Sequence, residues 1–439
     1  MKGIMVKKTG TYDTTIGNLG PAKIATPQHL VKYRKDSEIS TMMMTGEQLT
    51  ELGSETVSMQ FEKAGPRDKI YFDPSKTKCA IVTCGGLCPG INDVIRSIVN
   101  EAHYNYGIRT VLGIRYGLRG FIPKYGYDVE ELTPRSVSNI HHFGGTVLGS
   151  SRGPQDPGEI VDSLERLNVN ILFVIGGDGS MRAAKAIVEE VTRRGRKIAV
   201  IGIPKTIDND INFITRSFGF DTAVEKATEA IHCAHAEAIG MDNGVGLVKL
   251  MGREAGFIAA QATLAMQEVN FLLVPEEPLV LEGKNGFLKA LEKRLRMRGH
   301  ALIVCAEGAG QELLRNEELK DASGNKKLGD ICTFLMDRIK AHFKANDFEM
   351  FMKFIDPSYI IRSVPANAGD RVYCGFLGQN AVHAAMAGKT GMVVAQLKSS
   401  MVHLPLDLVT AKRRTMNVDS DYWRAVLEAT GQQAYYEGD

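Results

Sequence analysis

The chain has 439 residues, enough for two or three domains with large buried cores. Its net charge of +2 gives no reason to expect nucleic acid or an anionic membrane as a partner. The seven cysteines are dispersed and odd in number, and the first residues lack the apolar stretch of a signal peptide. No apolar run approaches the roughly 20 residues that span a bilayer. We therefore expect reduced thiols and a cytoplasmic location.

Residues 1–77 show weak periodicity and are expected to form an N-terminal extension that embraces the core. Beyond them, short apolar runs alternate with segments of helical spacing. Strands are expected at 78–83, 110–114, 171–175, 198–203, 245–250 and 302–306, and helices at 90–106, 157–167, 181–194, 221–239 and 254–266, with Asp221 as a helix cap. This alternation predicts an α/β fold of two αβα three-layer sandwich domains with mainly parallel sheets.

Two loops carry features of an anion site. The run Gly85-Gly86-Leu87-Cys88-Pro89-Gly90 joins a strand to a helix, where glycines and free N–H groups let phosphate approach the backbone. A tight turn explains this run equally well, because it lacks the Gly-Lys-Ser/Thr ending of a Walker A loop. The run Ser150-Ser151-Arg152-Gly153 offers a guanidinium that suits phosphate oxygens, although a surface arginine in a turn is the simpler interpretation.

The loop Gly176-Gly177-Asp178-Gly179-Ser180 follows an apolar strand and is more specific. An aspartate at a glycine-rich strand end is a suitable Mg²⁺ ligand, since Mg²⁺ prefers oxygen and keeps several waters. Asp178 can also cap the next helix, and the two roles are compatible. The loop indicates a phosphoryl donor more than it indicates an acceptor.

The run Pro204-Lys205-Thr206-Ile207-Asp208-Asn209-Asp210 is the most informative stretch. It places two carboxylates, a hydroxyl and an ammonium after another apolar strand, at the sheet edge where open α/β folds bind ligands. Phosphoryl transfer needs a phosphate cradle, a metal ligand and a base, and these neighbouring loops supply all three.

With these loops taken together, the chain resembles the 6-phosphofructokinases over most of residues 78–425. It looks most like the ATP-dependent branch found in trypanosomatids and some bacteria, which is related in sequence to the pyrophosphate-using enzymes. The motifs that carry the resemblance are the loops at 85–90, 149–152, 176–179 and 204–210, together with Gly219-Phe220-Asp221-Thr222, Met251-Gly252-Arg253 and Ala306-Glu307-Gly308.

On the donor side, the resemblance implies that Asp208 accepts the proton of the sugar 1-hydroxyl, with Asp210 supporting it. Thr206 would contact the substrate, and Lys205 would stabilise transition-state charge. Asp178 would hold Mg²⁺ on the phosphates of ATP. The remaining donor-binding residues would be Gly86, Arg152, Gly153, Gly177, Gly179 and Ser180.

On the acceptor side, the resemblance implies a fructose 6-phosphate site. Glu307 would accept hydrogen bonds from sugar hydroxyls, and Arg362 would supply donors to the 6-phosphate. The remaining substrate-binding residues would be Met251, Gly252, Arg253, Lys353 and Tyr359, along with Thr206 and Asp208. Gly244 stands near the position where many bacterial members have an arginine that usually reaches the substrate of a neighbouring subunit, so that contact is not expected from this strand.

The choice of phosphoryl donor depends on two positions. Gly179 leaves room for the α-phosphate of a nucleotide, where the pyrophosphate-dependent relatives usually have an aspartate. Lys205 is typical of the pyrophosphate enzymes, but it occurs beside glycine in the trypanosomatid-like branch. We therefore expect ATP and keep pyrophosphate as the alternative. A catalytically silent sugar-phosphate sensor would not need Asp208.

The expected domains are 78–215, with part of 390–439, for the nucleotide and 216–389 for fructose 6-phosphate. The resemblance implies a homotetramer in glycolysis, with neither nucleic acid nor membrane as a partner. A kinase of this kind is a candidate for allosteric control, but the sequence shows no effector-site motif. The basic cluster Lys412-Arg413-Arg414 is interpreted as a solvated face or a site near the donor phosphates.

Overall fold

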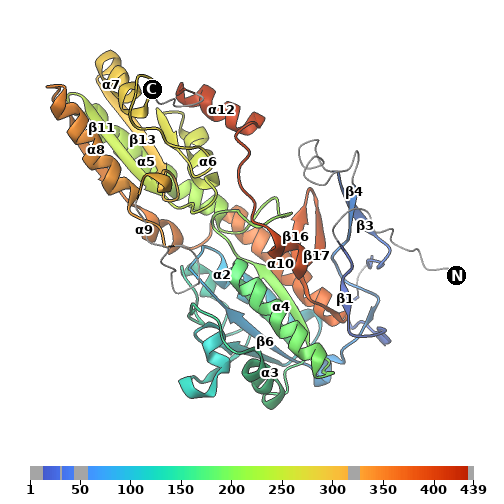
Figure 1. Ribbon diagram of the computed structural model, residues 1–439. Helices are drawn as coiled ribbons and strands as arrows, with labels where there is room; N and C mark the ends of the chain where they lie inside the picture. The colour runs from blue at the N-terminus through green and yellow to red at the C-terminus, as the bar shows by residue number, and fades with distance from the viewer. Residues whose placement is uncertain (1–12, 30–31, 44–57, 315–326, 434–439) are drawn as a thin grey trace. The chain divides into compact units, whose positions relative to one another are not determined.

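The computed structural model describes residues 13–29, 32–43, 58–314 and 327–433 (Figure 1). The chain divides into two compact units. Unit 1 contains the residues up to Thr206, Ile211–Phe218 and Pro365–Arg413, and unit 2 contains Ile207–Asp210, Gly219–Val364 and the residues from Arg414 onward. None of the helices in the described ranges is long and apolar enough to cross a membrane.

Unit 1 is built on a seven-stranded sheet in the order β17-β16-β10-β9-β6-β7-β8. The inner pairs are parallel, while β8 and β17 pair antiparallel at the two edges. The strands are β6 (Lys78–Thr83), β7 (Thr110–Ile114), β8 (Val129–Leu132), β9 (Ile171–Gly176), β10 (Ala199–Pro204), β16 (Met392–Leu397) and β17 (Ser400–Pro405). The helices are α2 (Ile91–Asn100), α3 (Pro157–Arg166), α4 (Asp178–Arg193), α10 (Ala368–Met386) and α11 (Leu406–Ala411).

Helices cover both faces of this sheet. Alternate strand residues such as Ala80, Val82 and Leu172 share a buried core with apolar residues of α3 and α4. Helices α2 and α10 pack on each other, and both contact unit 1 strands or turns. A π-helical turn at Glu101–Asn105 extends α2, and short 3₁₀ turns lie at Pro74–Lys76, Gly117–Phe121, Pro123–Tyr125 and Ile140–His142.

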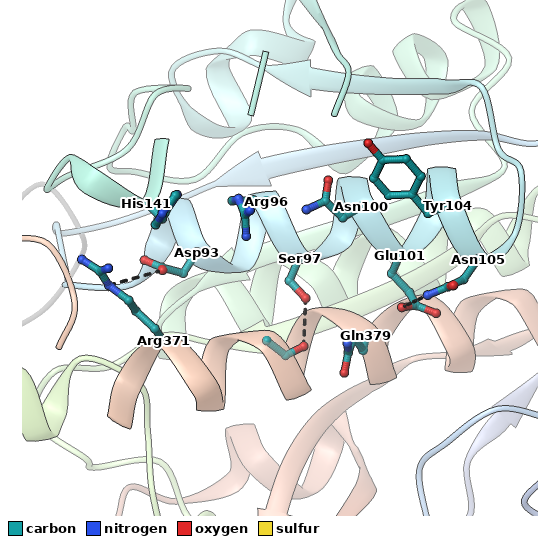
Figure 2. Close-up of a pocket in the computed structure, with 11 residues that line it drawn as sticks. Asp93, Arg96, Ser97, Asn100, Glu101, Tyr104, Asn105, His141, Arg371 and Gln379 are labelled. Atoms are coloured by element: carbon teal, nitrogen blue, oxygen red, sulfur yellow. Dashed lines mark hydrogen bonds and ion pairs between the residues drawn. The ribbon is translucent and has the colours of Figure 1, made fainter. Parts of the chain in front are cut away.

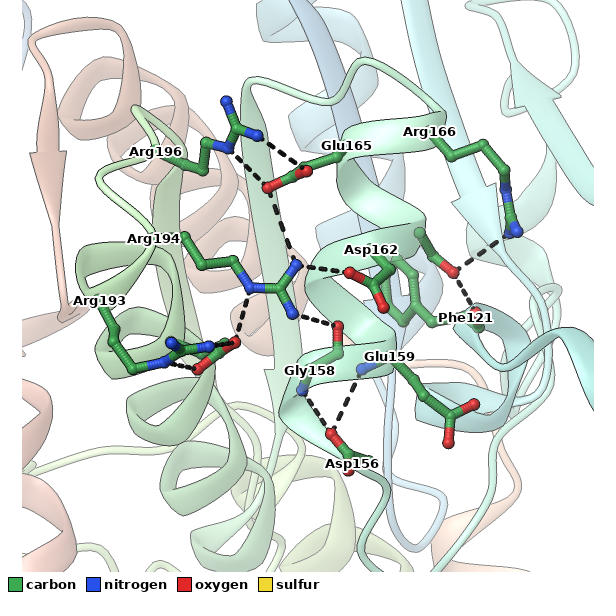
Figure 3. Close-up of polar contacts among 12 residues, drawn as sticks. Phe121, Asp156, Gly158, Glu159, Asp162, Glu165, Arg166, Arg193, Arg194 and Arg196 are labelled. Carbon is green, nitrogen blue, oxygen red and sulfur yellow. Dashed lines mark hydrogen bonds and ion pairs between the residues drawn. The ribbon is translucent and has the colours of Figure 1, made fainter.

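Arginines at the end of α4 tie this helix to α3 (Figure 3). Arg194 donates to Glu190 at 2.6 Å, to Asp162 at 2.5 Å and to the Gly158 carbonyl at 3.1 Å. The hydrogen bonds that Arg194 donates to the carboxylates of Asp162 and Glu190 raise the pKa of its guanidinium. This arrangement fixes the C-terminal end of the helix whose first turn carries Asp178.

Residues 58–77 of the expected extension pack on unit 1. Phe61 is fully buried in the core of the large sheet. Glu62 accepts hydrogen bonds from Lys389 at 3.0 Å and His403 at 3.2 Å. Burial would raise its pKa, but His403 and Lys389 outweigh burial and lower the pKa of Glu62 to about 2. The short strands are β1 (Gly17–Asn18), β2 (Ile24–Ala25), β3 (Ile39–Met43), β4 (Ser58–Glu62), β5 (Lys69–Ile70) and β15 (Lys389–Thr390).

Unit 2 has a four-stranded parallel sheet in the order β12-β13-β11-β14. Its strands are β11 (Gly244–Leu250), β12 (Phe271–Leu273), β13 (His300–Ala306) and β14 (Phe351–Ile355). One face packs on α5 (Phe220–Ile239), α6 (Phe257–Met266) and α12 (Asp421–Thr430), and the other packs on α7 (Phe287–Arg298) and α8 (Ile331–Ala345). The short α9 is Ser358–Arg362, and a 3₁₀ turn lies at Gln311–Leu313. Both units are therefore αβα sandwiches, as the sequence predicts.

Some expectations differ from the structure. Asp221 lies inside the first turn of α5, and Gly219 is the N-cap with φ of 83°, which favours glycine. Helix α6 begins at Phe257, later than expected. The two units also differ from the expected domain ranges, because α10 lies in unit 1 whereas 207–210 and α12 lie in unit 2.

Candidate functional site

The carboxyl ends of β6, β9 and β10 bring three sequence motifs to one edge of the unit 1 sheet. Thr83 pairs with Ile175, and Gly176 pairs with Pro204, so the loops after these strands start side by side. The backbone N–H of Lys205 donates to the Gly176 carbonyl at 2.9 Å. This is the edge of a parallel sheet at which ligands bind in open α/β folds.

The glycine turn at 85–90 lies against the arginine loop at 150–153. The Gly85 N–H donates to the Ser151 carbonyl at 3.1 Å, and the Ser150 hydroxyl donates to the Gly85 carbonyl at 2.7 Å. Gly90 begins α2 with φ of 100°, and a Cβ there would lie 2.7 Å from the Cys374 sulfur. Position 90 therefore requires glycine, and the turn leads into the N-terminus of α2.

Two cations flank this turn. A Cβ on Gly86 would lie 3.8 Å from a terminal nitrogen of Arg152, and a Cβ on Gly85 would lie 3.7 Å from the ammonium of Lys205. Lys205 is only 6% exposed. Burial raises the pKa of the neighbouring Cys84 thiol to about 12 despite the charge of Lys205, so this sulfur stays a neutral thiol. Cations beside backbone amides of this kind are suited to binding an anion.

Asp178 occupies the first turn of α4, after the N-cap Gly177. Its Oδ2 lies 2.6 Å from Arg182 and 3.4 Å from Arg413, and its side chain is 15% exposed. The next residue, Gly179, is exposed, and a Cβ there would meet no atom within 4 Å. Ser180 packs closely against Gly176, and a Cβ added at Gly176 would lie 2.3 Å from the serine hydroxyl.

The donor set around Asp178 fits a magnesium ion that is carried by a polyphosphate. The described residues contain no group of three or more His, Cys, Asp or Glu side chains that could hold a metal by themselves. Mg²⁺ commonly uses one or two protein carboxylates and takes its other ligands from phosphates and water. Asp178, a single partly exposed carboxylate beside a candidate anion site, fits this mode of Mg²⁺ binding.

The run 204–210 is shared between the units. Lys205 and Thr206 lie in unit 1, where the Thr206 carbonyl accepts a hydrogen bond of 2.6 Å from the Ser217 hydroxyl. Asp208 and Asp210 lie in unit 2, where the Asp210 carbonyl accepts from the Arg414 N–H at 2.8 Å. The proximity of Asp178 to Asp208 stays a prediction, because they belong to different units.

In unit 2, the acceptor-side motifs follow the carboxyl ends of β11, β13 and β14. Leu250 pairs with Ala306 at the strand ends. The N–H of Glu307 donates to Leu250 and that of Gly308 donates to Gly252, each at 2.9 Å. Gly252 has φ of 134°, and a Cβ there would lie 2.6 Å from the Ala255 carbonyl oxygen. This close packing fixes the 251–253 loop, including the buried Met251, against the 306–308 loop.

Charged side chains gather around Glu307. Burial raises the pKa of Glu307, while the charges of Arg253, Lys249 and Arg362 act to lower it. Lys249 also pairs with Asp356 at 2.9 Å, a contact between residues 107 positions apart. The arrangement combines a carboxyl group, which suits hydroxyl groups, with several cations, which suit a phosphate group.

The predicted phosphate-binding segment lies on α9. The Arg362 guanidinium lies 4.5 Å from the centroid of the Tyr359 ring, and Tyr359 is 73% exposed. Lys353 lies elsewhere: it is in the middle of β14, opposite Gly246, and its ammonium is 3.6 Å from Glu237 on α5. Unit 2 therefore brings Arg253, Glu307 and Arg362 together and leaves Lys353 away from the strand ends.

Sequence reasoning missed four residues of these clusters. Arg182 was not singled out, although its spacing of four from Asp178 is a helical pairing signal. Arg413 was seen as part of a basic cluster without its partner. Lys249 and Asp356 carry no local signal, because the fold alone brings them together.

A separate pocket of about 330 Å³ lies between α2 and α10 in unit 1 (Figure 2). Asp93 on α2 is 4.0 Å from Arg371 on α10, and the Ser97 hydroxyl donates to the Gly375 carbonyl at 2.8 Å. Burial raises the pKa of Asp93 to about 6, although Arg371 acts to lower it. The lining mixes both signs of charge, so the pocket offers no clear match to a phosphate group.

Comparisons with known proteins agree with these features. The family model described as Phosphofructokinase matches residues 78–385. The ATP-dependent 6-phosphofructokinase of Borreliella burgdorferi is 51% identical over 84% of this chain and 85% of its own length. The ATP-dependent 6-phosphofructokinase of Trypanosoma brucei brucei is 49% identical over 84% of this chain and 76% of its own length.

Solved structures support the fold alone, because their sequence identity to this chain is low. The pyrophosphate-dependent phosphofructokinase from Marinobacter aquaeolei has a TM-score of 0.66 at 21% identity, covering 83% of this chain and 93% of that protein. The Pichia pastoris phosphofructokinase has a TM-score of 0.62 at 21% identity, covering 82% of this chain and 37% of the other.

Proposed function

Because the chain belongs to the phosphofructokinase family, we propose that it is an ATP-dependent 6-phosphofructokinase, which transfers a phosphoryl group from ATP to fructose 6-phosphate. The observation that carries this proposal is the sequence identity of 49–51% to ATP-dependent 6-phosphofructokinases over most of the chain. The open space beside Gly179 supports the nucleotide donor over pyrophosphate, since it leaves room for an α-phosphate.

The donor phosphates would lie on the carboxyl edge of the unit 1 sheet. Arg152, Lys205 and the amides of the 85–90 turn would bind their oxygens, and Asp178 would hold Mg²⁺. When bound, the metal supplies positive charge that neutralises the transferring phosphoryl group. The ammonium of Lys205 would lie close to this group, because the side chain is buried beside the glycine turn, where electrostatic stabilisation is strong.

The sugar phosphate would lie at the carboxyl edge of the unit 2 sheet. Arg362 and Arg253 would bind the 6-phosphate or orient the sugar, and Glu307 would accept hydrogen bonds from hydroxyl groups. Asp208 would take the proton of the 1-hydroxyl group as the hydroxyl oxygen attacks the γ-phosphorus, and the bond between this phosphorus and the bridging oxygen would break to release ADP. Asp210 and Thr206 would hold the substrate and the base in position.

The direct test of this proposal is product identification. Purified protein is incubated with ATP, Mg²⁺ and fructose 6-phosphate, and the products are followed by ³¹P NMR. We expect ADP and fructose 1,6-bisphosphate to form in equal amounts. Hydrolysis of ATP without a new sugar phosphate, or transfer to a different hydroxyl group, would contradict the proposal.

We also propose that the chain assembles as a homotetramer. In unit 2, β14 lies at the edge of its sheet, and Phe351 and Phe354 on this strand are 43% and 39% exposed. An edge strand with exposed aromatic side chains favours association with another chain. Light scattering coupled to size-exclusion chromatography would test the stoichiometry. The cytoplasmic location and any allosteric control stay predictions from the sequence.

A further inference from the structure

Two arginines meet on one oxygen of the proposed metal-binding carboxylate. Arg182 and Arg413 both contact Oδ2 of Asp178, at 2.6 and 3.4 Å. Asp178 makes no hydrogen bond through Oδ1 to any residue that the structure describes. One carboxylate oxygen is thus engaged by cations, while the other is the one available to a metal or its bound water.

The two arginines reach this carboxylate in different ways. Arg182 is four residues from Asp178 on the same helix, and such pairs are common on helix surfaces. Arg413 lies 235 positions from Asp178 in the sequence, and its side chain is only 22% exposed. The position of Arg413 therefore depends on the tertiary fold of unit 1 and not on helical spacing.

Neighbouring contacts hold the backbone of Arg413 in place. Its residue pairs with Ile211 in an isolated antiparallel bridge. The preceding helix, α11, is linked to α4 by an ion pair of 2.5 Å between Lys185 and Asp407. The guanidinium is therefore presented to Asp178 from a backbone position that is paired with Ile211 and follows a helix linked to α4.

This geometry creates a competition between cations. A guanidinium that pairs with Asp178 neutralises the carboxylate and repels a free divalent cation. A divalent cation bound to a triphosphate arrives together with the negative charge of the phosphate groups. A guanidinium has several N–H donors in one plane, and these suit phosphate oxygens as well as carboxylate oxygens.

We propose that Arg413 is a positioning residue of the donor site, which holds Asp178 until the metal–nucleotide complex binds and then pairs with its phosphate oxygens. This inference rests on the proposed function. It implies that the site discriminates between the free divalent ion and the same ion on a nucleotide. Replacing Arg413 should therefore change the two affinities in opposite directions.

The test is a titration with Mn²⁺, which accepts the same oxygen ligands and is detected by electron paramagnetic resonance. Arg413→Gln should bind Mn²⁺ alone more tightly than the parent does. It should bind Mn²⁺–ATP roughly 10-fold more weakly, the size of effect expected for the loss of a charged hydrogen bond. In turnover assays, the KM for ATP should rise while the KM for fructose 6-phosphate stays constant.

The matched control is Arg193→Gln. Arg193 lies on the same helix as Asp178, pairs with Glu190 at 2.6 Å, and is about 22 Å away along the helix. Arg193→Gln removes the same charge as Arg413→Gln, so we expect the affinities for Mn²⁺ and for Mn²⁺–ATP to stay at the parent values. If Arg413→Gln melts at a much lower temperature, Arg413→Lys replaces it and should show smaller changes of the same signs.

The two ion affinities separate the possible outcomes. If both fall together, or if neither changes, Arg413 only packs against the helix and the inference is wrong. Failure of the proposed function would look different: the parent would not phosphorylate fructose 6-phosphate with ATP. The Mn²⁺ titration without nucleotide would still report whether Arg413 competes for Asp178.

Discussion

The carboxyl edges of the two parallel sheets present charge in different ways. In unit 1, backbone amides of glycine turns lie between Arg152 and Lys205, and Asp178 is the carboxylate beside them. In unit 2, the charges of Arg253, Lys249 and Arg362 act on the partly buried Glu307. Backbone amides can follow a flexible polyphosphate, whereas a mixed side-chain cluster can distinguish hydroxyl groups from a single phosphate. One architecture thus provides two kinds of site.

The largest loss of activity is expected from a substitution at Asp208. Asp208→Ala should lower kcat by roughly 10²–10⁴-fold, because the proposed general base is lost, while fructose 6-phosphate binding is largely kept. Steady-state kinetics and isothermal calorimetry measure the two quantities. Asp242→Ala, at an exposed turn before β11, is the control and should change neither. Unchanged turnover of Asp208→Ala would remove this residue from the mechanism.

The donor edge is tested at Gly179. A Cβ there meets no protein atom, so Gly179→Asp should fold normally. Its carboxylate would lie near the α-phosphate and repel it, and kcat/KM for ATP should fall by about 10²-fold, the effect of a few kcal/mol. Gly179→Ala adds little bulk and no charge, so it should keep most of the ATP activity. Use of ATP by Gly179→Asp at the parent's rate would disprove the argument.

The acceptor edge is tested at Arg362. Arg362→Ala should raise the KM for fructose 6-phosphate by roughly 10- to 100-fold, because hydrogen bonds to charged groups contribute about 1.5–3 kcal/mol. The KM for ATP should stay the same. Arg362→Lys keeps the charge but loses the planar fork, so its effect should be intermediate. A change in the KM for ATP alone would show that Arg362 acts at the donor site and not at the acceptor site.

The smallest effect is expected away from both edges, at Asp93. The pKa of the Asp93 carboxyl is about 6 in the folded state and 3.8 ordinarily. The folded state therefore loses stability as the pH rises from 3.8 to about 6. Asp93→Asn removes the buried charge and should raise the melting temperature at pH 8 by roughly 2–4 °C, with no gain near pH 4. Calorimetry at both pH values checks this. Equal shifts at the two pH values would show that burial of charge is not the cause.

The sequence predicts the local elements better than their assembly. Strands β6 and β7 have the expected bounds, because each is an apolar run between polar or glycine-rich segments. The place of β16 beside β10 is set by the tertiary fold, since the two strands are almost two hundred residues apart in the chain. The expected domain ranges return the chain to the nucleotide domain at about residue 390, whereas unit 1 already includes α10.

The same distinction holds for the candidate sites. The loops at 85–90, 176–180 and 204–206 were predictable because parallel strands end at one edge. The contact of Arg413 with Asp178 and that of Lys249 with Asp356 were not, because each joins distant segments. The sequence shows which residues can perform the chemistry, and the fold decides which of them meet.

The central claim is that this enzyme takes its phosphoryl group from ATP. The most direct measurement compares ATP and pyrophosphate, at equal concentrations and with saturating fructose 6-phosphate and Mg²⁺, in an assay coupled to fructose 1,6-bisphosphate. We expect rapid turnover with ATP and little or none with pyrophosphate. Turnover with pyrophosphate that equals or exceeds turnover with ATP would contradict the account.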